Sequence, residues 1–257
     1  MIYQRREIIG NAILYLGDCM LILPSLQRPH AIVCDPPYGQ GLKTNITGKS
    51  VSGRRAGSGR PYALHDKRRK TAVGIHSTGV ATQFPDRLQG DSLDAPFDVT
   101  ALLPYAEKLL LWGAHKFAHR LPPGRWLAWD KVPTGKVRDQ GDGEMAWTNV
   151  HPSAVTRFYR LLWDGVCVAS AARHEVTAGQ RRVHPTQKPE ALMEWCLSFL
   201  DLQPVSLICD PCMGAGSTGV AALRHGHHFI GIEIEPVYFE AACRRIEGAQ
   251  RQLRLIG

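Results

Sequence analysis

The chain lacks any long apolar segment, and this absence excludes several classes of protein. No stretch approaches the ~18 consecutive apolar residues of a membrane-spanning helix. The N-terminal stretch MIYQRREIIGNAILYLGD carries charges and no uninterrupted apolar core, so it does not resemble a secretory signal peptide. Cys209 and Cys212 form one C-x-x-C pair, but no second Cys or His pair stands at zinc spacing. We therefore expect a cytoplasmic protein with no membrane association and no bound metal.

The cysteines and the net charge indicate the redox state of the protein and the kind of partner that it binds. The 7 cysteines are odd in number and mostly lie in apolar stretches, which favours reduced, buried thiols. The formal net charge of +8 favours a polyanion such as nucleic acid as a partner. A basic soluble protein without such a partner has the same composition, so the charge alone does not decide. The 257 residues suffice for one large core.

Short apolar runs alternate with helix-like patterns along the chain, which is typical of a doubly wound α/β sheet. Several of the runs are apolar on both faces, as in strands that are covered on both sides. The predicted strands are Ala12–Leu16, Ala31–Cys34, Leu109–Trp112, Trp126–Trp129, Val205–Cys209 and Phe229–Ile232. The predicted helices are Cys19–Leu26, Val99–Lys108, His115–Leu121, Pro189–Leu200, Ser217–His225 and Pro236–Ile246.

Two segments interrupt this rhythm. Residues 40–98 have almost no apolar period and are rich in Gly, Ser and basic residues, so we expect a long mobile loop. A solvated insert without a task would have the same composition, but the excess of bases favours contact with phosphates. Its basic residues are Arg54, Arg55, Arg60, Lys67, Arg68, Arg69 and Lys70. The second segment, residues 133–183, contains acids and the stretch RFYRLLW, and it is either a small lobe or a set of long connections.

A glycine-rich loop follows the predicted strand that ends near Asp210. In LICDPCMGAGSTG, the glycines at 214, 216 and 219 fit the G-x-G-x-x-G pattern, and Glu233 follows Gly214 by 19 positions. That offset is typical of a nucleotide-binding βαβ unit in which the acid holds ribose hydroxyls. A tight strand-to-helix turn without a ligand is the alternative, since the glycine pattern alone is weak.

The acid before this loop indicates which nucleotide it would bind. A dinucleotide site places pyrophosphate at the helix N-terminus, and a carboxylate at Asp210 would repel it. The arrangement suits a ligand that has a ribose and an ammonium group but no phosphate, and S-adenosylmethionine is such a ligand. Few residues follow Gly219, so we expect the other half of the sheet to come from the front of the chain. If the strands that end at Asp35 and Asp210 flank the point where strand order reverses, their loops meet across one crevice.

Four motifs in one order resemble those of amino-group DNA methyltransferases. They are DPPYG at 35–39, HPTQKP at 184–189, DPCMGAGSTG at 210–219 and FIGIEIEP at 229–236. The catalytic motif comes first and the cofactor motif last, which resembles the permuted β group, and YLGDC at 15–19 fits the same pattern. WLAWDK at 126–131 and EMAWTN at 144–149 look like the small phage and prophage members. Two features depart from the family: Cys212-Met213, where Phe is more usual, and the unusually basic insert.

The resemblance implies a fold and a role for each matching residue. The implied fold is a mostly parallel, Rossmann-like methyltransferase sheet with circularly permuted motif order. It would form a single catalytic domain over residues 1–257, with 40–98 as a basic insert and 133–183 as a target-recognition segment. The residues that would hold the target base are Asp35, Pro36, Pro37 and Tyr38. The residues that would bind the cofactor are Asp18, His184, Thr186, Lys188, Asp210, Gly214, Gly216, Ser217, Thr218 and Glu233. Asp18 would lie by the adenine, Glu233 by the ribose, and His184, Thr186 and Lys188 near the methionine end.

The chemistry of an exocyclic base amine explains the DPPY motif. The amine is a poor nucleophile, and acceptors for its hydrogens, Asp35 and the Pro36 carbonyl, would stabilise the developing positive charge. The prolines add rigidity and bring no N–H group to compete for these acceptors. Tyr38 offers a ring face to a base that has left the duplex stack, since the amine is unreachable inside it.

We therefore predict transfer of a methyl group from S-adenosylmethionine to the N6 amine of adenine in double-stranded DNA. Arg157 and Arg160, with Phe158 and Tyr159 between them, are further candidates for DNA contact, although packing on the core would also explain RFYRLLW. The alternative substrate is the N4 amine of cytosine, for which the family more often begins the motif with Ser. An NAD-dependent dehydrogenase and a non-catalytic DNA-binding protein are less favoured alternatives. A homodimer is one oligomeric state to test, and no partner endonuclease is identified.

Overall fold

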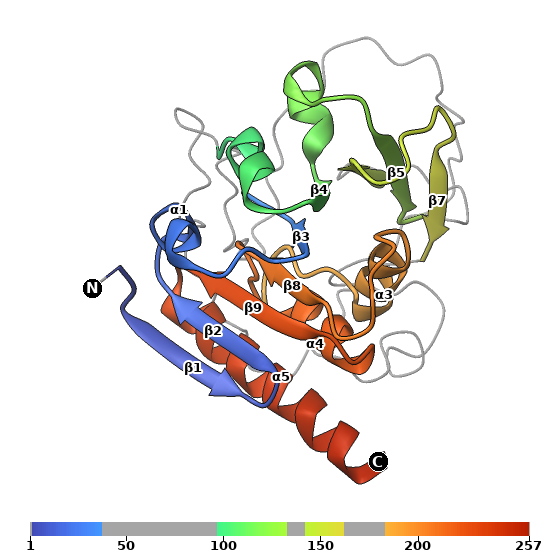
Figure 1. Cartoon of the computed structure of the whole chain (residues 1–257). Coiled ribbons are helices and arrows are strands. Elements are labelled where there is room, and N and C mark those ends of the chain that lie inside the picture. Colours follow the sequence, from blue (N-terminus) through green and yellow to red (C-terminus); the bar gives the residue numbers. More distant parts are fainter. Residues whose placement is uncertain (1, 38–96, 133–141, 162–182, 257) are drawn as a thin grey trace, which may run out of the picture.

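The computed structural model describes residues 2–37, 97–132, 142–161 and 183–256. Over these segments the chain forms one mixed sheet of 9 strands (Figure 1). Their spatial order is β1 (Arg5–Ile9), β2 (Ala12–Leu16), β9 (His228–Glu233), β8 (Leu207–Asp210), β3 (Ala31–Cys34), β4 (Lys108–Trp112), β6 (Gly143–Thr148), β5 (Arg125–Asp130) and β7 (Arg157–Arg160).

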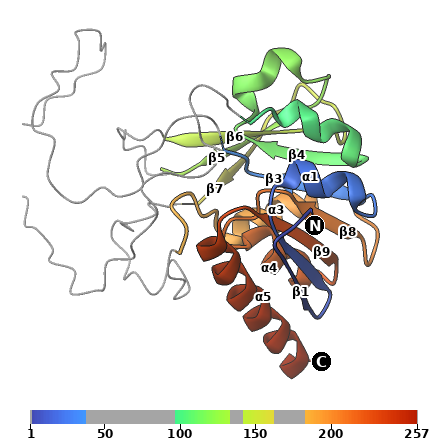
Figure 2. The ribbon, with the colours of Figure 1, turned by 90° about the vertical axis from the view of Figure 1, so that its left-hand side faces the viewer.

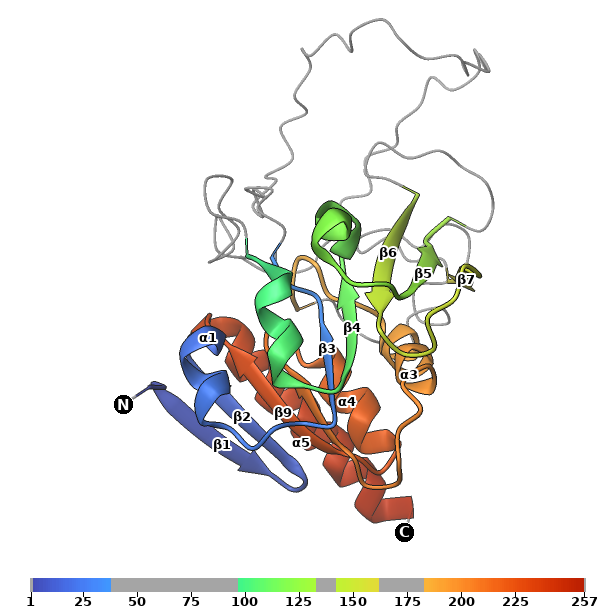
Figure 3. The ribbon, with the colours of Figure 1, turned by 45° about the horizontal axis from the view of Figure 1, so that its top comes forward.

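The middle of the sheet is parallel. Strands β2, β9, β8, β3 and β4 run the same way, while β1 and β6 are antiparallel to their neighbours. From β8 the chain moves outward to β9, and from β3 it moves outward to β4 in the opposite direction, so the strand order reverses between β8 and β3 (Figure 3). Ligands of open α/β sheets bind at such a point, outside the carboxyl ends of the strands. The predicted meeting of the loops after Cys34 and Asp210 is confirmed by the pairing of β3 with β8.

Helices cover both faces of the sheet (Figure 2). One face is covered by α3 (Glu190–Ser198), α4 (Ser217–Arg224) and α5 (Pro236–Ile256). The other is covered by α1 (Cys19–Ile22) and the 3₁₀ segments η1 (Leu23–Ser25), η2 (Val99–Tyr105) and η3 (Ala114–Arg120).

Alternation along the strands divides the core between these two layers. In β3, Ala31 and Val33 pack towards α3, α4 and α5, whereas Ile32 and Cys34 pack towards α1, η2 and η3. All four side chains are buried, as the fully apolar run AIVC predicts for a central parallel strand. Each large apolar side chain that is buried in this way contributes about 1.5–3 kcal/mol. The doubly wound α/β fold predicted from the sequence is therefore confirmed.

The six predicted strands are present, and three more were missed. The missed strands β1, β6 and β7 lie outside the parallel centre, and β1 and β7 form the edges of the sheet. Strand β7 has one pairing partner and mostly exposed side chains, so its sequence lacks an apolar run. Residues 142–161, which we interpreted as a lobe or a set of connections, instead extend the main sheet through β6 and β7.

Three of the six predicted helices differ in type, and the other three differ at their ends. The segment predicted over Cys19–Leu26 divides into α1 and η1, and the one over His115–Leu121 is η3. The segment predicted as a helix over Val99–Lys108 is a 3₁₀ segment with Pro104 inside it, and Lys108 already begins β4. Helix α5 continues beyond the predicted end at Ile246, because Ala249 and Leu253 keep packing on the core. Among the described residues, no helix combines the length and the apolar character that a membrane crossing requires.

Candidate active site

Four acids lie at the carboxyl ends of four neighbouring parallel strands. Asp18 comes after β2, Glu233 ends β9, Asp210 ends β8 and Asp35 comes after β3. Since these strands are adjacent and parallel, the four residues lie side by side at the carboxyl ends of the strands. The structure thus gathers residues that are far apart in the sequence.

The glycine loop after β8 folds over the end of β9. Gly214 and Gly216 have φ angles of +51° and +75°, a backbone conformation that favours glycine. The N–H of Gly214 donates to Oε2 of Glu233 at 2.8 Å, and the N–H of Glu235 donates to Oε1 at 2.8 Å. Both carboxylate oxygens of Glu233 therefore accept backbone hydrogen bonds, which fixes the loop against the strand.

Asp210 and Glu233 are buried carboxyls with raised pKa values. Burial raises the pKa of Asp210 to about 7, although the hydroxyl of Thr218 (2.6 Å) and the N–H of Cys212 (3.1 Å) donate to it and oppose the rise. Burial likewise raises the pKa of Glu233 to about 7, against the backbone hydrogen bonds that it accepts. Both groups therefore change protonation near neutral pH, which is uncommon for carboxyls and typical of functional sites.

The HPTQKP segment forms the opposite wall of a cavity at the switch point. Six of the residues that line this cavity are Asp35, His184, Lys188, Asp210, Gly214 and Thr218. The ring of His184 packs edge-on against Tyr238, with ring centroids 4.1 Å apart. Thr186 turns back onto His184, since its N–H lies 3.2 Å from Nδ1. The structure therefore brings the predicted residues of this segment to the glycine loop.

Asp35 contacts an ammonium group that the sequence did not assign to it. Nζ of Lys188 forms an ion pair with Oδ2 of Asp35 and lies 2.9 Å from Oε2 of Glu144, which also pairs with Lys131. Glu144 and Lys131 were missed as site residues. The strand GEMAWT contained a signal, because alternation places Glu144 on the same face as buried Ala146.

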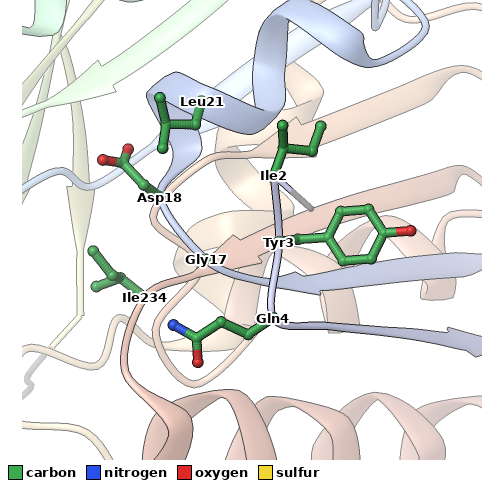
Figure 4. A pocket seen from close by; sticks show the side chains of 7 residues that line it. All are labelled: Ile2, Tyr3, Gln4, Gly17, Asp18, Leu21 and Ile234. Atoms are coloured by element: carbon green, nitrogen blue, oxygen red, sulfur yellow. The ribbon is translucent and has the colours of Figure 1, made fainter.

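A second hollow lies beside Asp18 (Figure 4). Asp18 caps α1 by accepting the N–H of Met20 at 2.8 Å, and Gly17 donates to the carbonyl of Glu233 at 2.9 Å. Leu21 of α1 and Ile234, which follows Glu233, line the same hollow. Because Ile234 directly follows Glu233, this hollow lies next to the end of β9.

An ionic network behind the site ties the three helices of one layer together. The hydroxyl of Ser217 donates to the carbonyl of Lys188 at 2.8 Å. Arg245 of α5 donates to Ser217 (3.2 Å) and pairs with Glu190 of α3 (2.7 Å). Arg245 and Glu190 were also missed, and neither the spacing nor the composition of their helices signals this contact.

Thiols fill the space behind the two acidic loops. Cys212 lies among Cys19 and Cys34, and burial raises the pKa of Cys34 to about 12. All six described cysteines are free thiols, and four of them are buried. The departure at Cys212 from the family motif is thus accommodated by two other cysteines.

The remaining predicted residues divide between described and undescribed segments. Pro36 and Pro37 follow β3 in a segment without assigned secondary structure, and Arg157 and Arg160 lie exposed on the edge strand β7. Tyr38 lies outside the described residues, as do Arg54, Arg55, Arg60, Lys67, Arg68, Arg69 and Lys70. Among the described residues, no group of three or more His, Cys, Asp or Glu side chains could hold a metal ion.

Comparison with protein families supports the resemblance stated above. Residues 126–244 match the N6_N4_Mtase family model, which is described as DNA methylase. This segment includes the HPTQKP motif, the glycine loop and Glu233, whereas Asp35 precedes it. The match confirms the resemblance to amino DNA methyltransferases.

Two curated relatives match over shorter segments. Type II methyltransferase M2.DpnII of Streptococcus pneumoniae is 45% identical over 64 residues, which is 25% of this chain and 24% of the relative. DNA adenine methyltransferase YhdJ of Escherichia coli (strain K12) is 41% identical over 66 residues, which is 26% of this chain and 22% of the relative. The matched segments thus span about a quarter of the length of these relatives.

Solved structures with the same fold cover most of the chain. The M1.HpyAVI–SAM complex aligns over 91% of this chain and 98% of its own, with a TM-score of 0.53 and 18% identity. PvuII DNA methyltransferase (cytosine-N4-specific) aligns over 98% of this chain and 96% of its own, with a TM-score of 0.50 and 13% identity. These likenesses confirm the Rossmann-like methyltransferase fold.

Proposed function

We propose that the protein transfers a methyl group from S-adenosylmethionine to the N6 amine of adenine in double-stranded DNA. The observation that carries this proposal is the meeting of two acidic loops at the switch point, where Asp35 and Asp210 line one cavity. One loop offers acceptors for an amine, and the other has the glycines and acids that suit a nucleoside. The names of two relatives, one a DNA adenine methyltransferase, support the same chemistry.

The residues of the glycine loop fit the proposed cofactor. Gly214 lines the cavity and has no side chain, so a ligand can approach its backbone, and Gly216 allows the loop to pack closely against α5. Glu233 would accept ribose hydroxyls, and the hollow between Asp18 and Ile234 would take the adenine that follows the ribose. Asp210 would face the charged methionine part, which would reach the cavity beside His184, Thr186 and Lys188. Ser217 and Thr218 begin α4 and hold Lys188 and Asp210 in place.

Bound S-adenosylmethionine supplies a methyl group on a sulfonium, which is already activated for transfer. The protein then has to hold the amine and polarise it. The carboxylate of Asp35 and the carbonyl of Pro36 would accept the two amine hydrogens, which stabilises the positive charge that develops on the nitrogen. Tyr38 would stack on the extruded base, an interaction worth about 1–3 kcal/mol. Correct alignment of amine and methyl group supplies much of the remaining rate.

DNA would contact the side of the molecule where the parallel strands end. Arg160 ends β7 on this side, Arg157 begins the same exposed strand, and the basic residues of segment 40–98 follow the DPPY motif in the sequence. Neutralising phosphates with such side chains gives affinity that falls with salt. We assign target recognition to residues 133–183, of which β6 and β7 are described.

Nucleoside analysis tests the proposed function directly. Double-stranded DNA is incubated with the protein and S-adenosylmethionine, digested, and its nucleosides are measured by mass spectrometry. N6-methyladenine is expected with the wild type and not with Asp35→Ala. N4-methylcytosine would instead support the alternative substrate, for which the same acceptors would serve. Absence of both products, with S-adenosylmethionine shown to bind, would overturn the proposal.

A further inference from the structure

The ammonium of Lys188 lies between two carboxylates that come from different strands. It pairs with Asp35, which follows β3, and lies 2.9 Å from Glu144 of β6. Its side chain is only 6% exposed, and Nζ lies 5.6 Å from the ring centroid of Trp112. The backbone of Lys188 is fixed separately, since its carbonyl accepts a hydrogen bond from Ser217. The backbone and the ammonium of Lys188 are therefore held by different partners.

These groups form a charge-balanced row in the order Lys131, Glu144, Lys188, Asp35. Burial lowers the pKa of Lys188, but Asp35 and Glu144 outweigh this and hold it above its usual range. Burial raises the pKa of Glu144, but Lys188 and Lys131 outweigh this and hold it below its usual range. Both net shifts favour the charged forms, although burial alone would favour the neutral ones. A buried ammonium without a partner would cost several kcal/mol, so each cation in the row depends on its carboxylates.

The position of Lys188 raises a problem for catalysis that Glu144 solves. Lys188 contacts the carboxylate of Asp35, which is proposed to accept the target amine. An incoming amine must share Asp35 with this ammonium or displace it. With Asp35 as its one carboxylate partner, Lys188 could release it only by becoming an unpaired buried charge. Glu144 offers a second carboxylate within 2.9 Å, so the ammonium can leave Asp35 and remain paired.

We propose that Lys188 is a positioning residue that keeps Asp35 ionised and oriented, and that Glu144 retains Lys188 when the target amine binds Asp35. This inference rests on the proposed function, because it assigns Asp35 to the amine. It places Lys188 on the amine side of the cavity as well as near the methionine end. Lys131 acts one step further out, by holding Glu144.

The pH dependence of methylation separates this role from a structural ion pair. Asp35 is faced by Lys188, by Asp210 across the switch point and by the thiol of Cys34 behind it. Glu144 is faced by Lys188 and Lys131. Removing the ammonium with Lys188→Met makes the ionised form of Asp35 less favourable. Since that form is the active one, the acid limb of kcat/KM should move to higher pH by about one unit or more.

Two further variants and a control are compared with Lys188→Met. Lys188→Arg keeps the charge but changes the shape, and we expect its acid limb to stay near that of the wild type. Glu144→Gln removes a negative charge near Asp35, so its acid limb should move to lower pH or stay, while kcat/KM for DNA falls at least tenfold. Glu247→Gln, on an exposed ion pair of α5, should leave both quantities unchanged. The affinity for S-adenosylmethionine should change less than threefold in Glu144→Gln.

A measurement without turnover completes the experiment. The ¹³C carboxyl resonance of Asp35 is titrated in the wild type and in Lys188→Met, and its midpoint should rise in the variant. Equal acid limbs in Lys188→Met and Lys188→Arg, or wild-type kcat/KM in Glu144→Gln, would overturn the proposal. If the wild type methylates no DNA, the proposed function fails and the catalytic role falls with it. The carboxyl titration then still decides whether Lys188 controls the ionisation of Asp35.

Discussion

Two loops with nearly the same sequence meet at the switch point and hold their acids in opposite ways. IVCDPP at 32–37 and LICDPC at 207–212 both end a buried parallel strand in Asp-Pro. Asp35 contacts the ammonium of Lys188. Asp210 instead accepts hydrogen bonds from Thr218 and Cys212, and within the described residues it has no ion pair. The two acids therefore differ in charge environment although their local sequences agree.

The difference shows that contacts with distant segments determine whether an acid at the end of a strand is held in its ionised form. A carboxylate that already faces a cation is held ionised and can accept hydrogen bonds from an amine at neutral pH. A buried carboxyl without a cation, such as Asp210 with its pKa of about 7, can take on full charge when a cationic ligand arrives. The first arrangement suits the target base, and the second suits a sulfonium or ammonium ligand.

Exchanging each acid for its amide should separate the two loops most strongly. Asp35→Asn should lower the rate of methyl transfer by about 10²–10³-fold, because an acceptor for the developing charge is lost. Its affinity for S-adenosylmethionine should change little. Asp210→Asn should weaken that affinity and leave the rate at saturating cofactor within about tenfold of wild type. Single-turnover rates over a cofactor titration measure both quantities, and the reverse pattern would exchange the roles of the two loops.

Glycine substitutions should show that the loop after β8 is built for close approach. Gly216 has φ +75°, and an added Cβ would lie 3.1 Å from Cβ of Ala242 and 3.2 Å from Cδ1 of Ile246. Gly226 has nearly the same φ, +74°, but nothing lies within 4 Å of an added Cβ. Gly226→Ala should cost about 1–2 kcal/mol of backbone strain, and Gly216→Ala should cost about 1–3 kcal/mol more from overpacking.

Urea unfolding and calorimetry of the two glycine variants measure these effects. Weaker binding of S-adenosylmethionine is expected in Gly216→Ala and not in Gly226→Ala. Equal stabilities and equal affinities in the two variants would mean that the loop has no special packing. Because both positions carry the same strain, the difference between them isolates the contacts of the loop with α5.

The central strands and the acids that end them could be predicted from the sequence, because each depends on local order. Ala31–Cys34 and Ala12–Leu16 are apolar throughout, so their bounds agree with the prediction. Strand β7 depends on pairing with β5, which its own residues do not reveal. The same holds for the site: Asp35, Asp210 and Gly216 belong to local motifs, whereas Glu144 and Arg245 acquire partners only when distant elements pack. Local motifs and the meeting of the two acidic loops could be predicted from the sequence, whereas contacts between individual side chains of distant elements could not.

Cofactor binding should depend on pH through the loop after β8. In the free protein Asp210 and Glu233 have pKa values of about 7. A cation beside Asp210 favours its charged form and lowers its pKa, so binding releases a proton near neutral pH. Below pH 7 the free carboxyl is protonated and must lose that proton, so affinity should fall by about tenfold per such group from pH 8 to pH 6.

Calorimetry in buffers of different ionisation enthalpy measures the proton release. Asp210 is faced by Asp35 and Glu233, and its donors are Thr218 and Cys212. Asp210→Asn should remove the part of the proton release that comes from Asp210 and retain the part that comes from Glu233. Affinity that does not vary between pH 6 and pH 8 would contradict the assignment. The same experiment with Asp35→Asn should retain the dependence, since Asp35 belongs to the other loop.

The arginines of the edge strand β7 should affect DNA binding and leave cofactor binding unchanged. Strand β7 lies four strands from β3, about 19 Å at the usual strand spacing, and its arginines are exposed. In Arg157→Gln/Arg160→Gln, DNA affinity should fall by severalfold, and the slope of log K against log salt should decrease by about two, since each phosphate contact contributes about 0.9. Arg6→Gln on β1, at the opposite edge, should leave the slope unchanged.

Fluorescence anisotropy at several salt concentrations measures the slope, and calorimetry should find unchanged affinity for S-adenosylmethionine in both variants. An equal loss of slope at the two edges would mean that basic charge acts without regard to position. A loss confined to β7 would support DNA binding on the side of β3, where Asp35 is proposed to accept the amine.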